Sequence, residues 1–528
     1  MPVYPVDWPG FGAGLNLRAK PGEAAPAECV DALNVTFTEA GAVKSRDGYG
    51  ILTAAEGTNR YDSLTPFYKS DGTRQLVAGA TTRLEAISTA GAIVASKTGQ
   101  TAYPHFFARY GGPAGEYLFA ANGADPLRKW DGSSWTEPSY TGTSPTGKFV
   151  AVTPWDNRMI CANYGSGTAG ANRNSIRFSD AGDPLTWGST NYKDLNPGDG
   201  QQITGLAVWD NRVFIFKTQS IWVIWGTGTD STGNPTWDAT ARVVDTAVGC
   251  TSSKGIAVGR DGVYFITERG VYRTDGGPAK PVSGNLDPLF GGSTGDFYQG
   301  SPVSRSNIDQ AALHVHREQL YASVPTAGAT NDTTLVLDTR YGWWTTFDFP
   351  AAALTSFQVT ANTPELVFAL ASGDKHIARH SSAYTTDDGA TINTRFMSAW
   401  SDLPGVVASR RSQVKTIREA KVWAKGALNF GIARDFATSA PTTTLDFDAG
   451  VDLWGDGTDA DDVWADGTDT TDTWGVGRSL APKLYRSAIR GYTFAVYVVN
   501  DASTPWTLYR VAPHVRSARG PEVLRTEA

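Results

Sequence analysis

Aspartates at near-regular spacing are the residues of this sequence that most readily suggest chemistry. Between residues 435 and 477 there are eleven Asp and no Lys or Arg, and Trp454, Trp464 and Trp474 recur every ten residues. Carboxylates at alternate positions after a Gly turn are ligands for hard cations such as Ca²⁺. However, no complete EF-hand loop is present, and the period differs from the nonapeptide repeat of calcium-binding β-rolls. We therefore favour solvated acidic turns over a calcium site.

Two histidine pairs have spacings that metal sites use. His314 and His316 are two residues apart in a predicted strand, so their side chains point to one face. His376 and His380 are four residues apart. Neither pair has a third ligand nearby in the sequence, and a protein zinc site needs at least three. We interpret both pairs as surface or edge histidines and expect no metal and no other cofactor.

One segment is similar to a motif of glycoside hydrolases. Residues 179–187, SDAGDPLTW, are similar to the Asp-box of sialidases, but the spacing differs and the segment occurs once. Hydrolysis also needs a paired acid and base or nucleophile, and the sequence does not single out such a pair. No serine-nucleophile elbow, P-loop or zinc-protease motif occurs. We therefore expect no enzymatic activity.

A repeated strand–turn–strand unit supplies the elements that must position any site. The turns lie near Gly72, Pro113, Asn157, Asn211, Gly262, Glu318 and Glu365. Two units share the tetrapeptide Trp-Asp-Asn-Arg, at residues 155–158 and 209–212. A strand-built period of roughly 40 to 55 residues is typical of a β-propeller blade. The sequence thus predicts an all-β fold with a propeller of about seven blades, with six as the alternative.

Composition supports this fold class and excludes others. The chain has 528 residues with 57 Gly, 28 Pro and 11 % aromatic residues, and Asp-Gly pairs supply the positive φ angles of tight hairpins. A net charge of −7 gives no general attraction for nucleic acid or anionic membranes. The cysteines, Cys29, Cys161 and Cys250, lack Cys-x-x-Cys spacing, so we expect buried free thiols. We expect neither a secretory signal nor a membrane span.

Periodicity and charge divide the chain into three parts. Residues 1–49 are predicted to form an arm and a hairpin that closes the propeller. Residues 50–384 are predicted to form the propeller itself. Residues 385–528 read as a small β-sandwich that contains the Asp-rich Trp repeat. Among the propeller residues, the following are predicted to be largely buried: Phe214, Phe216, Trp222, Tyr264, Phe265 and Phe368.

Charge segregation inside the third part suggests a contact surface. Residues 406–434 carry seven Lys or Arg and one acid, immediately before the Asp-rich stretch. We expect the basic strands to face neighbouring protein, which includes the Asp-rich turns of the same or the next subunit. The candidate contact residues are Arg410, Arg411, Lys415, Arg418, Lys421, Asp456, Asp459, Asp466 and Asp469.

Several segments, in their order along the chain, carry a family resemblance. They are residues 34–37 with Gly41 and residues 46–48; residues 175–180 with Asp183, Pro184 and Trp187; residues 198–200 with 203–206; residues 216–217 with 220–222; and residues 249–250 with 262–265 and 270–272. This order resembles propeller-type virion proteins of tailed bacteriophages, in particular the tail nozzle (tail tubular protein B) of short-tailed phages. The resemblance covers roughly residues 30–280.

The resemblance implies a structural role in a virion that is assembled in the host cytoplasm. Nozzle proteins form a hexameric ring below the tail adaptor, contact other tail proteins that include fibres, retain the viral double-stranded DNA and let it pass on infection. The resemblance therefore implies a ring-forming homo-oligomer that conducts DNA without binding it specifically. The alternative is a tail-tip or fibre-attachment protein that binds or cleaves host-surface carbohydrate.

Overall fold

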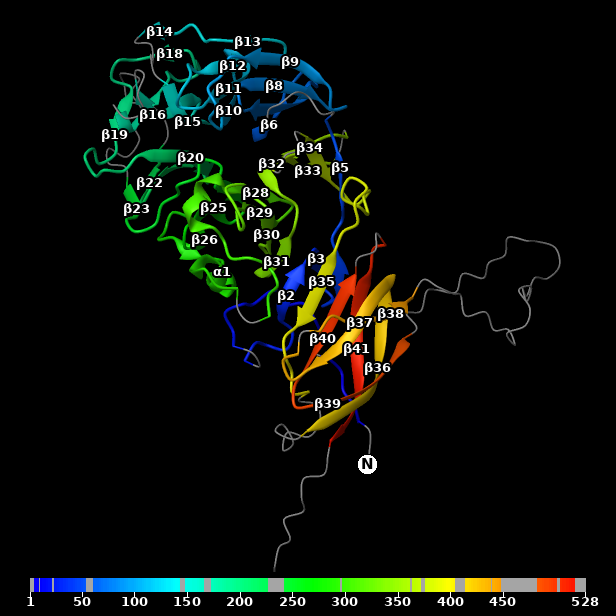
Figure 1. Ribbon diagram of the computed structural model, residues 1–528. Coiled ribbons are helices and arrows are strands. Elements are labelled where there is room, and N and C mark those ends of the chain that lie inside the picture. The colour runs from blue at the N-terminus through cyan, green and yellow to red at the C-terminus, as the bar shows by residue number, and fades with distance from the viewer. Residues whose placement is uncertain are drawn as a thin grey trace, which may run out of the picture. The chain divides into compact units, whose positions relative to one another are not determined.

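Two compact units make up the chain (Figure 1). The structure, a computed structural model, describes residues 4–8, 10–20, 23–53, 60–142, 148–165, 172–226, 242–294, 297–360, 363–371, 376–403, 414–437, 439–447, 482–500 and 504–517. The propeller unit comprises Gly48–Gly295 and Gln299–Gly389, and the two-sheet unit comprises Met1–Asp47, Asp296–Tyr298 and Ala390–Ala528. The N-terminal residues thus share a unit with the C-terminal part, whereas the sequence suggested a separate arm.

Seven sets of four antiparallel strands occur in the described part of the propeller unit; six are four-stranded sheets, and the sixth set along the chain is part of a nine-stranded sheet. The first three contain β6 (Tyr61–Tyr68), β7 (Arg74–Ala80), β8 (Arg83–Ser88) and β9 (Ile93–Thr98); β10 (Phe106–Gly112), β11 (Gly115–Ala121), β12 (Arg128–Trp130) and β13 (Trp135–Thr136); and β15 (Lys148–Trp155), β16 (Arg158–Gly165), β17 (Asn172–Phe178) and β19 (Tyr192–Asp194). The next two contain β20 (Ile203–Trp209), β21 (Arg212–Lys217), β22 (Ile221–Ile224) and β23 (Arg242–Asp245); and β24 (Ile256–Gly259), β25 (Gly262–Thr267), β26 (Gly270–Thr274) and β27 (Lys280–Pro281). The last two contain β28 (Ala312–His316), β29 (Gln319–Val324), β30 (Thr333–Asp338) and β31 (Trp343–Phe347); and β32 (Ala351–Phe357), β33 (Glu365–Leu370), β34 (Ile377–His380) and β5 (Tyr49–Ile51).

The predicted turns all lie between the first and second strands of these sheets. In both Trp-Asp-Asn-Arg units the Trp pairs with the Arg across the turn. The two central residues have φ values of 50° and 54° in one unit and 49° and 55° in the other. Two left-handed residues define the type I′ turn, whose twist matches that of the flanking strands. Asp and Asn tolerate this conformation, which explains their repeated use here.

The first strands of the sheets form a closed ring. β6, β10, β15, β20, β24, β28 and β32 each contact the next one, and β32 contacts β6. The sheet of β32 takes its outer strand, β5, from the beginning of the unit, where Ile51 pairs with Ala378. In Figure 1 the sheets follow one another in colour from blue at β6 to yellow-green at β32–β34. The arrangement is that of a β-propeller, closed by pairing of its first and last segments.

The predicted closing hairpin differs from the strand that closes the ring. β3 (Val35–Phe37) and β4 (Val43–Ser45) form the expected hairpin, but β4 pairs with β41 (Thr507–Ser517) in the other unit. Val43 and its cross-strand partner Leu508 are both fully buried there. Burial of this apolar pair explains why the hairpin joins the two-sheet unit and leaves ring closure to the short strand β5.

Apolar side chains occupy the interior of the ring at one level. Gly205 on β20 faces Ile256 on β24 and Phe106 on β10, so residues from three different sheets meet there. A Cβ atom at Gly205 would lie 3.7 Å from Phe106 Cε2 and well inside van der Waals contact with Ile256 Cδ1. The absence of a side chain at Gly205 thus lets Ile256 and Phe106 fill this space.

Replacing Gly205 by alanine should therefore strain the centre of the propeller. We expect Gly205→Ala to lower the free energy of unfolding by about 1 to 3 kcal/mol, the usual cost of overpacking a filled core. Adding Ile256→Val removes the clashing Cδ1 methyl and should restore part of that loss. Chemical denaturation of the two variants and the double variant measures both effects, and additive losses would contradict a direct contact.

The predicted core residues of the propeller are buried with one exception. Phe214, Phe216, Phe265 and Phe368 are completely buried and Tyr264 is 2 % exposed, which confirms those predictions. Trp222 is only partly buried and packs at the edge of an apolar cluster between the third and fourth sheets. The centre of its indole ring lies 5.8 Å from Lys217 Nζ.

Two antiparallel sheets form the other unit. One contains β3, β4, β41, β36 (Lys415–Lys425) and β39 (Lys483–Gly491), with β1 (Tyr4–Pro5) paired to β41. The other contains, in this unit, β2 (Cys29–Leu33), β35 (Thr394–Ser398), β40 (Phe494–Asn500), β37 (Ala427–Arg434) and β38 (Thr443–Asp446). The two sheets contact each other through Phe430 and Tyr485, whose ring centroids are 5.1 Å apart, and through Trp506 Nε1, which donates to Thr394 Oγ1 at 2.9 Å.

The remaining elements are short. β14 (Thr141–Gly142) pairs in parallel with β18 (Thr186–Trp187). The helical segments are η1 (Gly284–Leu286), α1 (Asp287–Gly291) and η2 (Arg305–Gln310). Within the described ranges, no helix is long and apolar enough to cross a membrane. All three cysteines are buried and free, as predicted.

Candidate functional site

A buried lysine joins three segments of the family resemblance. Lys217, the last residue of β21, is completely buried, and its Nζ donates to Asp199 Oδ2 at 2.6 Å and to the Leu195 carbonyl at 2.8 Å. Its backbone carbonyl accepts from Cys250 N at 2.9 Å, and its amide donates to Ser220 O at 2.9 Å. The segments around Asp199, Lys217 and Cys250, separate in the sequence, therefore meet at one point.

Asp199 is held in its charged form at this point. Burial opposes ionisation, but hydrogen bonds from Lys217 and from the Gln201 backbone amide keep the pKa of Asp199 below its usual range. The glycines on either side, Gly198 and Gly200, have φ values of 91° and 75°, so the loop turns sharply around the carboxylate. Glycine accepts such φ values without strain, which explains the sequence Gly-Asp-Gly.

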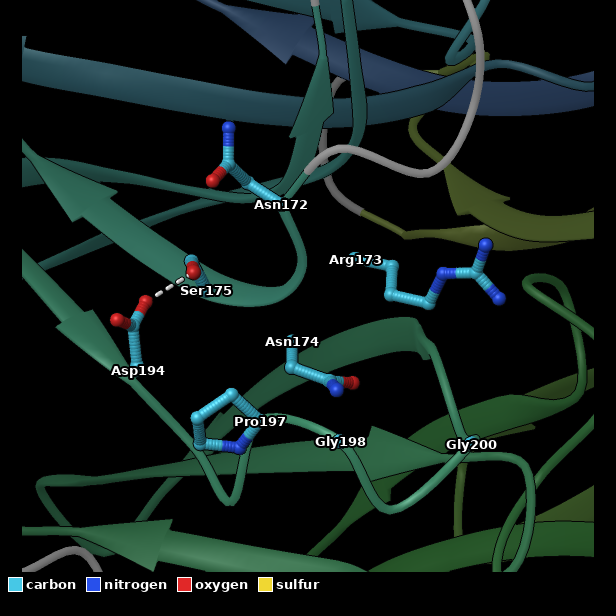
Figure 2. Close-up of a pocket in the computed structure, with 8 residues that line it drawn as sticks. All are labelled: Asn172, Arg173, Asn174, Ser175, Asp194, Pro197, Gly198 and Gly200. Atoms are coloured by element: carbon cyan, nitrogen blue, oxygen red, sulfur yellow. Dashed lines mark hydrogen bonds between the residues drawn. The ribbon is translucent and has the colours of Figure 1, made fainter.

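A cavity of about 360 Å³ opens beside this network. Its walls come from the beginning of β17, the end of β19 and the loop after β19; they are Asn172, Arg173, Asn174, Ser175, Asp194, Pro197, Gly198 and Gly200. Figure 2 shows the Ser175 hydroxyl directed at Asp194 and the Asn174 amide extended towards the loop. Ser175 and Asp194 are cross-strand neighbours, and the hydroxyl donates to Asp194 Oδ1.

Asn174, one of the residues that line the cavity, carries an unpaired acceptor that is itself buried from solvent. The side chain is 7 % exposed, its Nδ2 lies 3.4 Å from Asp199 Oδ1, and its Oδ1 has no hydrogen-bond partner. The opposite amide orientation would place Oδ1 against the Asp199 carboxylate, so the charge of Asp199 fixes Oδ1 away from it. An unpaired buried acceptor costs free energy and is a feature that needs an explanation.

A second candidate site is an exposed face of the sheet that contains β36. Strand register places alternate residues of β4, β36, β39 and β41 on this face, which we call the basic face. Its cations are Lys44, Lys421, Lys425, Arg486, Arg490, Arg510 and Arg516. The opposite face is apolar, with Ile417, Val422 and Val515 completely buried.

Few groups neutralise the basic face. Among the described residues, the only carboxylate that the register places on it is Glu419, whose Oε1 lies 2.7 Å from His514 Nδ1. Asp7 approaches from outside the sheet and forms an exposed ion pair with Arg510. Arg510 also lies 4.9 Å from the centre of the Trp423 ring, and Leu484 is 39 % exposed beside Lys421. The face is therefore cationic with apolar groups between the charges.

The predicted contact residues divide between three places. Arg418 and Lys421 are exposed on β36, as a contact surface requires. Lys415 lies on the opposite, inner side of the strand and is buried, and burial lowers its pKa although Asp402 opposes this shift. The alternation of the strand accounts for this placement, because Lys415 is in step with buried Ile417. The other predicted residues lie outside the described ranges: Arg410, Arg411, Asp456, Asp459, Asp466 and Asp469.

The histidines that the sequence placed at the surface have internal partners. His314 Nε2 and His316 Nδ1 lie 2.7 and 2.9 Å from the same atom, Ser356 Oγ on the neighbouring first strand β32. Burial lowers the pKa of each histidine to about 4. His376 Nδ1 lies 2.8 Å from the Thr53 carbonyl oxygen. Among the described residues, no group of three or more His, Cys, Asp or Glu is placed to hold a metal ion.

The sequence interpretation missed the roles of Asn174, Asp194, Asp199 and Lys217. One signal was present: Lys217 ends the otherwise apolar run of β21, RVFIFK, and a lysine in such a run needs a buried anion. The unpaired acceptor of Asn174 had no sequence signal, because it depends on how β17 meets the loop that contains Asp199.

Comparison with known proteins gives no family assignment. No family model and no curated protein matches the chain. Among solved structures, BBS1N in complex with ARL6DN, in a crystal soaked with mercury, has a TM-score of 0.39 and 10 % identity, and covers 64 % of this chain and 99 % of that chain. The same complex soaked with lead has a TM-score of 0.39, 10 % identity, and coverage of 63 % and 96 %.

Proposed function

We propose that this chain is a structural protein of a bacteriophage virion, a tail nozzle or tail-tube component that assembles into a ring. In this proposal the seven sheets are the blades of one propeller, and the two-sheet unit is a β-sandwich. The ring, hexameric by resemblance, sits below the tail adaptor, contacts other tail proteins and conducts viral DNA without specific binding.

The basic face carries the proposal. Its seven cations and one carboxylate give it a balance of +6, whereas the whole chain has a net charge of −7, so the rest carries −13. The positive charge of the basic face is complementary to the negative charge on the rest of a second copy of the chain. Contacts between two different patches are head-to-tail, and such contacts close into rings when the rotation permits. Leu484 and Trp423 add apolar area, which suits a protein partner better than a phosphate backbone.

The neighbour's acidic surface includes the Asp-rich turns of the third sequence part. In the proposed ring the cations of the basic face are buried in contacts between subunits. The lumen therefore carries more Asp and Glu than Lys and Arg. Each cation–phosphate contact would add affinity and slow the passage of DNA. Like charge on the lumen keeps DNA off the wall within about a Debye length, roughly 10 Å.

A non-catalytic role agrees with the use of the resemblance residues. Lys217 forms a hydrogen bond to the Asp199 carboxylate through its side chain and accepts one from the Cys250 amide through its carbonyl. These contacts hold the loops together. We propose that the purified chain has no hydrolytic activity and needs no cofactor. Turnover of a polysaccharide or sialoside panel that is lost on changing one Asp or Glu would contradict this.

Charge reversal on the basic face tests the assembly. The variant Lys421→Glu/Arg486→Glu/Arg490→Glu should remain folded, because these positions are exposed, and should lose the ring. The wild-type ring should weaken as salt rises from 0.05 to 0.5 M, since exposed charge pairs are screened. Native mass spectrometry and negative-stain microscopy measure both effects.

A matched control changes the same charge elsewhere. Arg18→Glu/Lys20→Glu/Lys280→Glu also replaces three exposed cations, and it should assemble normally. Rings that survive reversal of the basic face would refute this contact. In the assembled particle, a lumen lined by arginine and lysine, or a chain that remains a monomer, would refute the conduit itself.

A further inference from the structure

We infer that two aromatic turns at one end of the two-sheet unit form a docking surface for the Asp-rich stretch, residues 451–474, of a second copy of the chain. The aromatic residues are Phe436, in the turn after β37, and Tyr492, in the turn between β39 and β40. The inference rests on the proposed ring and adds an aromatic anchor to its charged contact.

Phe436 has a backbone conformation that disfavours a large side chain. Its φ is 65° and that of Asp435 is 45°, and the Ala437 amide donates to the Arg434 carbonyl at 2.8 Å across this type I′ turn. The two Trp-Asp-Asn-Arg turns have Asp and Asn at the corresponding positions. A bulky residue with a positive φ is an outlier that costs free energy, and such outliers gather at functional sites.

Packing inside the unit uses only part of this side chain. Phe436 packs on Trp400 and Phe297, with ring centroids 5.0 and 6.0 Å apart, yet it remains 43 % exposed. Tyr492 is 53 % exposed, and its side chain has no hydrogen bond or ring contact among the described residues. Two large aromatic side chains are therefore open to a partner, and aromatic residues are enriched among the residues that dominate protein interfaces.

The Asp435 carboxylate joins the two turns. Its Oδ1 accepts from the backbone amides of Tyr492 and Thr493 at 2.7 and 3.2 Å. A Cβ atom at Gly491 would lie 2.8 Å from Asp435 Oδ2, so glycine at this position leaves room for the carboxylate. The turns that carry Phe436 and Tyr492 thus form one surface.

This surface continues into the basic face. Arg490 belongs to that face and precedes Tyr492 by two residues, and Arg434 Nη1 donates to the Arg490 carbonyl at 3.1 Å. Both arginines are exposed. Aromatic side chains beside cations are complementary to a segment that carries aromatic side chains beside anions.

The Asp-rich stretch has this complementary composition. Residues 451–474 contain eight Asp and no Lys or Arg, with Trp454, Trp464 and Trp474 among the aspartates. The ring proposal already places this stretch in the acidic surface of the neighbouring copy. The aromatic surface therefore gives its tryptophans a place to pack next to the cations that attract its aspartates.

The flanks of the stretch favour a second copy over the same copy. Lys483, the first residue of β39, donates through Nζ to the carbonyl of Asp446, the last residue of β38. The stretch therefore leaves and re-enters the unit at the start of β39. Tyr492 follows the other end of this nine-residue strand, roughly 30 Å away at about 3.3 Å per residue.

A synthetic peptide of residues 451–474 tests the docking on the full chain, at protein concentrations too low for the copies to associate. The peptide should bind, and a peptide with Ala in place of the three Trp, which has the same charge, should bind about tenfold more weakly or worse. Tyr492→Ser should weaken binding of the original peptide to a similar extent. Its thermal stability should equal that of the wild type, because the Tyr492 side chain has no hydrogen bond or ring contact to lose. Fluorescence anisotropy of a labelled peptide measures these affinities.

Ring assembly tests the same surface without a peptide. Phe436→Asn removes the aromatic ring and supplies a residue that tolerates the positive φ. This variant and Tyr492→Ser should each weaken assembly about tenfold or more in native mass spectrometry. The matched control is Tyr103→Ser, at a tyrosine of the propeller unit that is 55 % exposed, and it should assemble normally.

The outcomes separate this inference from the ring proposal. Equal binding of the two peptides, or a Tyr492→Ser chain that binds the peptide and assembles as the wild type does, would overturn the docking surface. Rings that are lost on charge reversal of the basic face but survive Tyr492→Ser would overturn it and leave the proposed ring intact. A wild-type chain that remains a monomer would refute the ring, and the peptide measurement would still decide whether this surface binds the Asp-rich stretch.

Discussion

Replacing Lys217 by methionine should lower the free energy of unfolding by about 3 to 5 kcal/mol, the usual cost of breaking a buried ion pair. Methionine fills a similar volume, so little packing is lost. The loss comes from Asp199, whose side chain is 12 % exposed and would keep its charge without the Nζ partner. The Leu195 carbonyl would also lose its donor. Denaturant unfolding followed by tryptophan fluorescence measures the change.

The double variant Lys217→Met/Asp199→Asn separates pairing from burial. Removing both charges leaves no uncompensated ion, so the double variant should be more stable than Lys217→Met alone. Lys280→Met, at an exposed position, should change stability by less than about 0.5 kcal/mol. A Lys217→Met protein within 1 kcal/mol of the wild type would show that the pair contributes little.

The sequence predicted the repeated sheets well because local signals determine them. Alternating apolar strands and turns of the Asp-Asn and Asp-Gly type act over a few residues, and each predicted turn lies where a first strand meets a second. Ring closure was harder, because two hairpin strands and β5 follow one another and only long-range pairing decides which of them joins β34. Propensity carries no information on that choice.

The candidate sites were predicted less completely for the same reason. The basic strand was visible as composition, but the contributions of Lys44, Arg510 and Arg516 come from strands far away in the sequence. The position of Lys415 depended on strand phase, which a bulge between Ile417 and Glu419 resets. His314 and His316 were placed on one face correctly, while their shared partner Ser356 required the neighbouring sheet.

Acidification from pH 6.5 to pH 4 should destabilise the propeller unit. Burial lowers the pKa of His105, His314 and His316 to about 4, below the ordinary value of 6.5. Between these values the unfolded chain binds more protons than the folded one, so stability is fully present above pH 6.5 and is lost as the pH falls. Each fully buried histidine contributes up to about 3 kcal/mol over this range. His314, which is half-buried, contributes less.

The charges that face these histidines set the size of the effect. Asp125 partly stabilises protonated His105, whereas His316 and Arg317 oppose protonation in the other pair. Burial raises the pKa of Asp62, and this group acts in the opposite direction because the folded state then holds its proton more tightly. The pKa values of Asp71 and Asp131 are lowered to about 2, so their contributions are lost below about pH 4, outside the window.

A single substitution isolates one histidine from the rest. Both ring nitrogens of His105 are buried without a hydrogen-bond partner, so His105→Leu removes a titrating group and breaks no side-chain hydrogen bond of the ring. Each histidine contributes a slope of about 1.4 kcal/mol per pH unit between its two pKa values. The free energy of unfolding of His105→Leu should therefore fall less steeply with acidification than that of the wild type, by about this slope. Equal slopes for the two proteins, or a wild-type stability that stays constant between pH 7 and pH 4.5, would mean that these histidines remain accessible to protons in the folded chain.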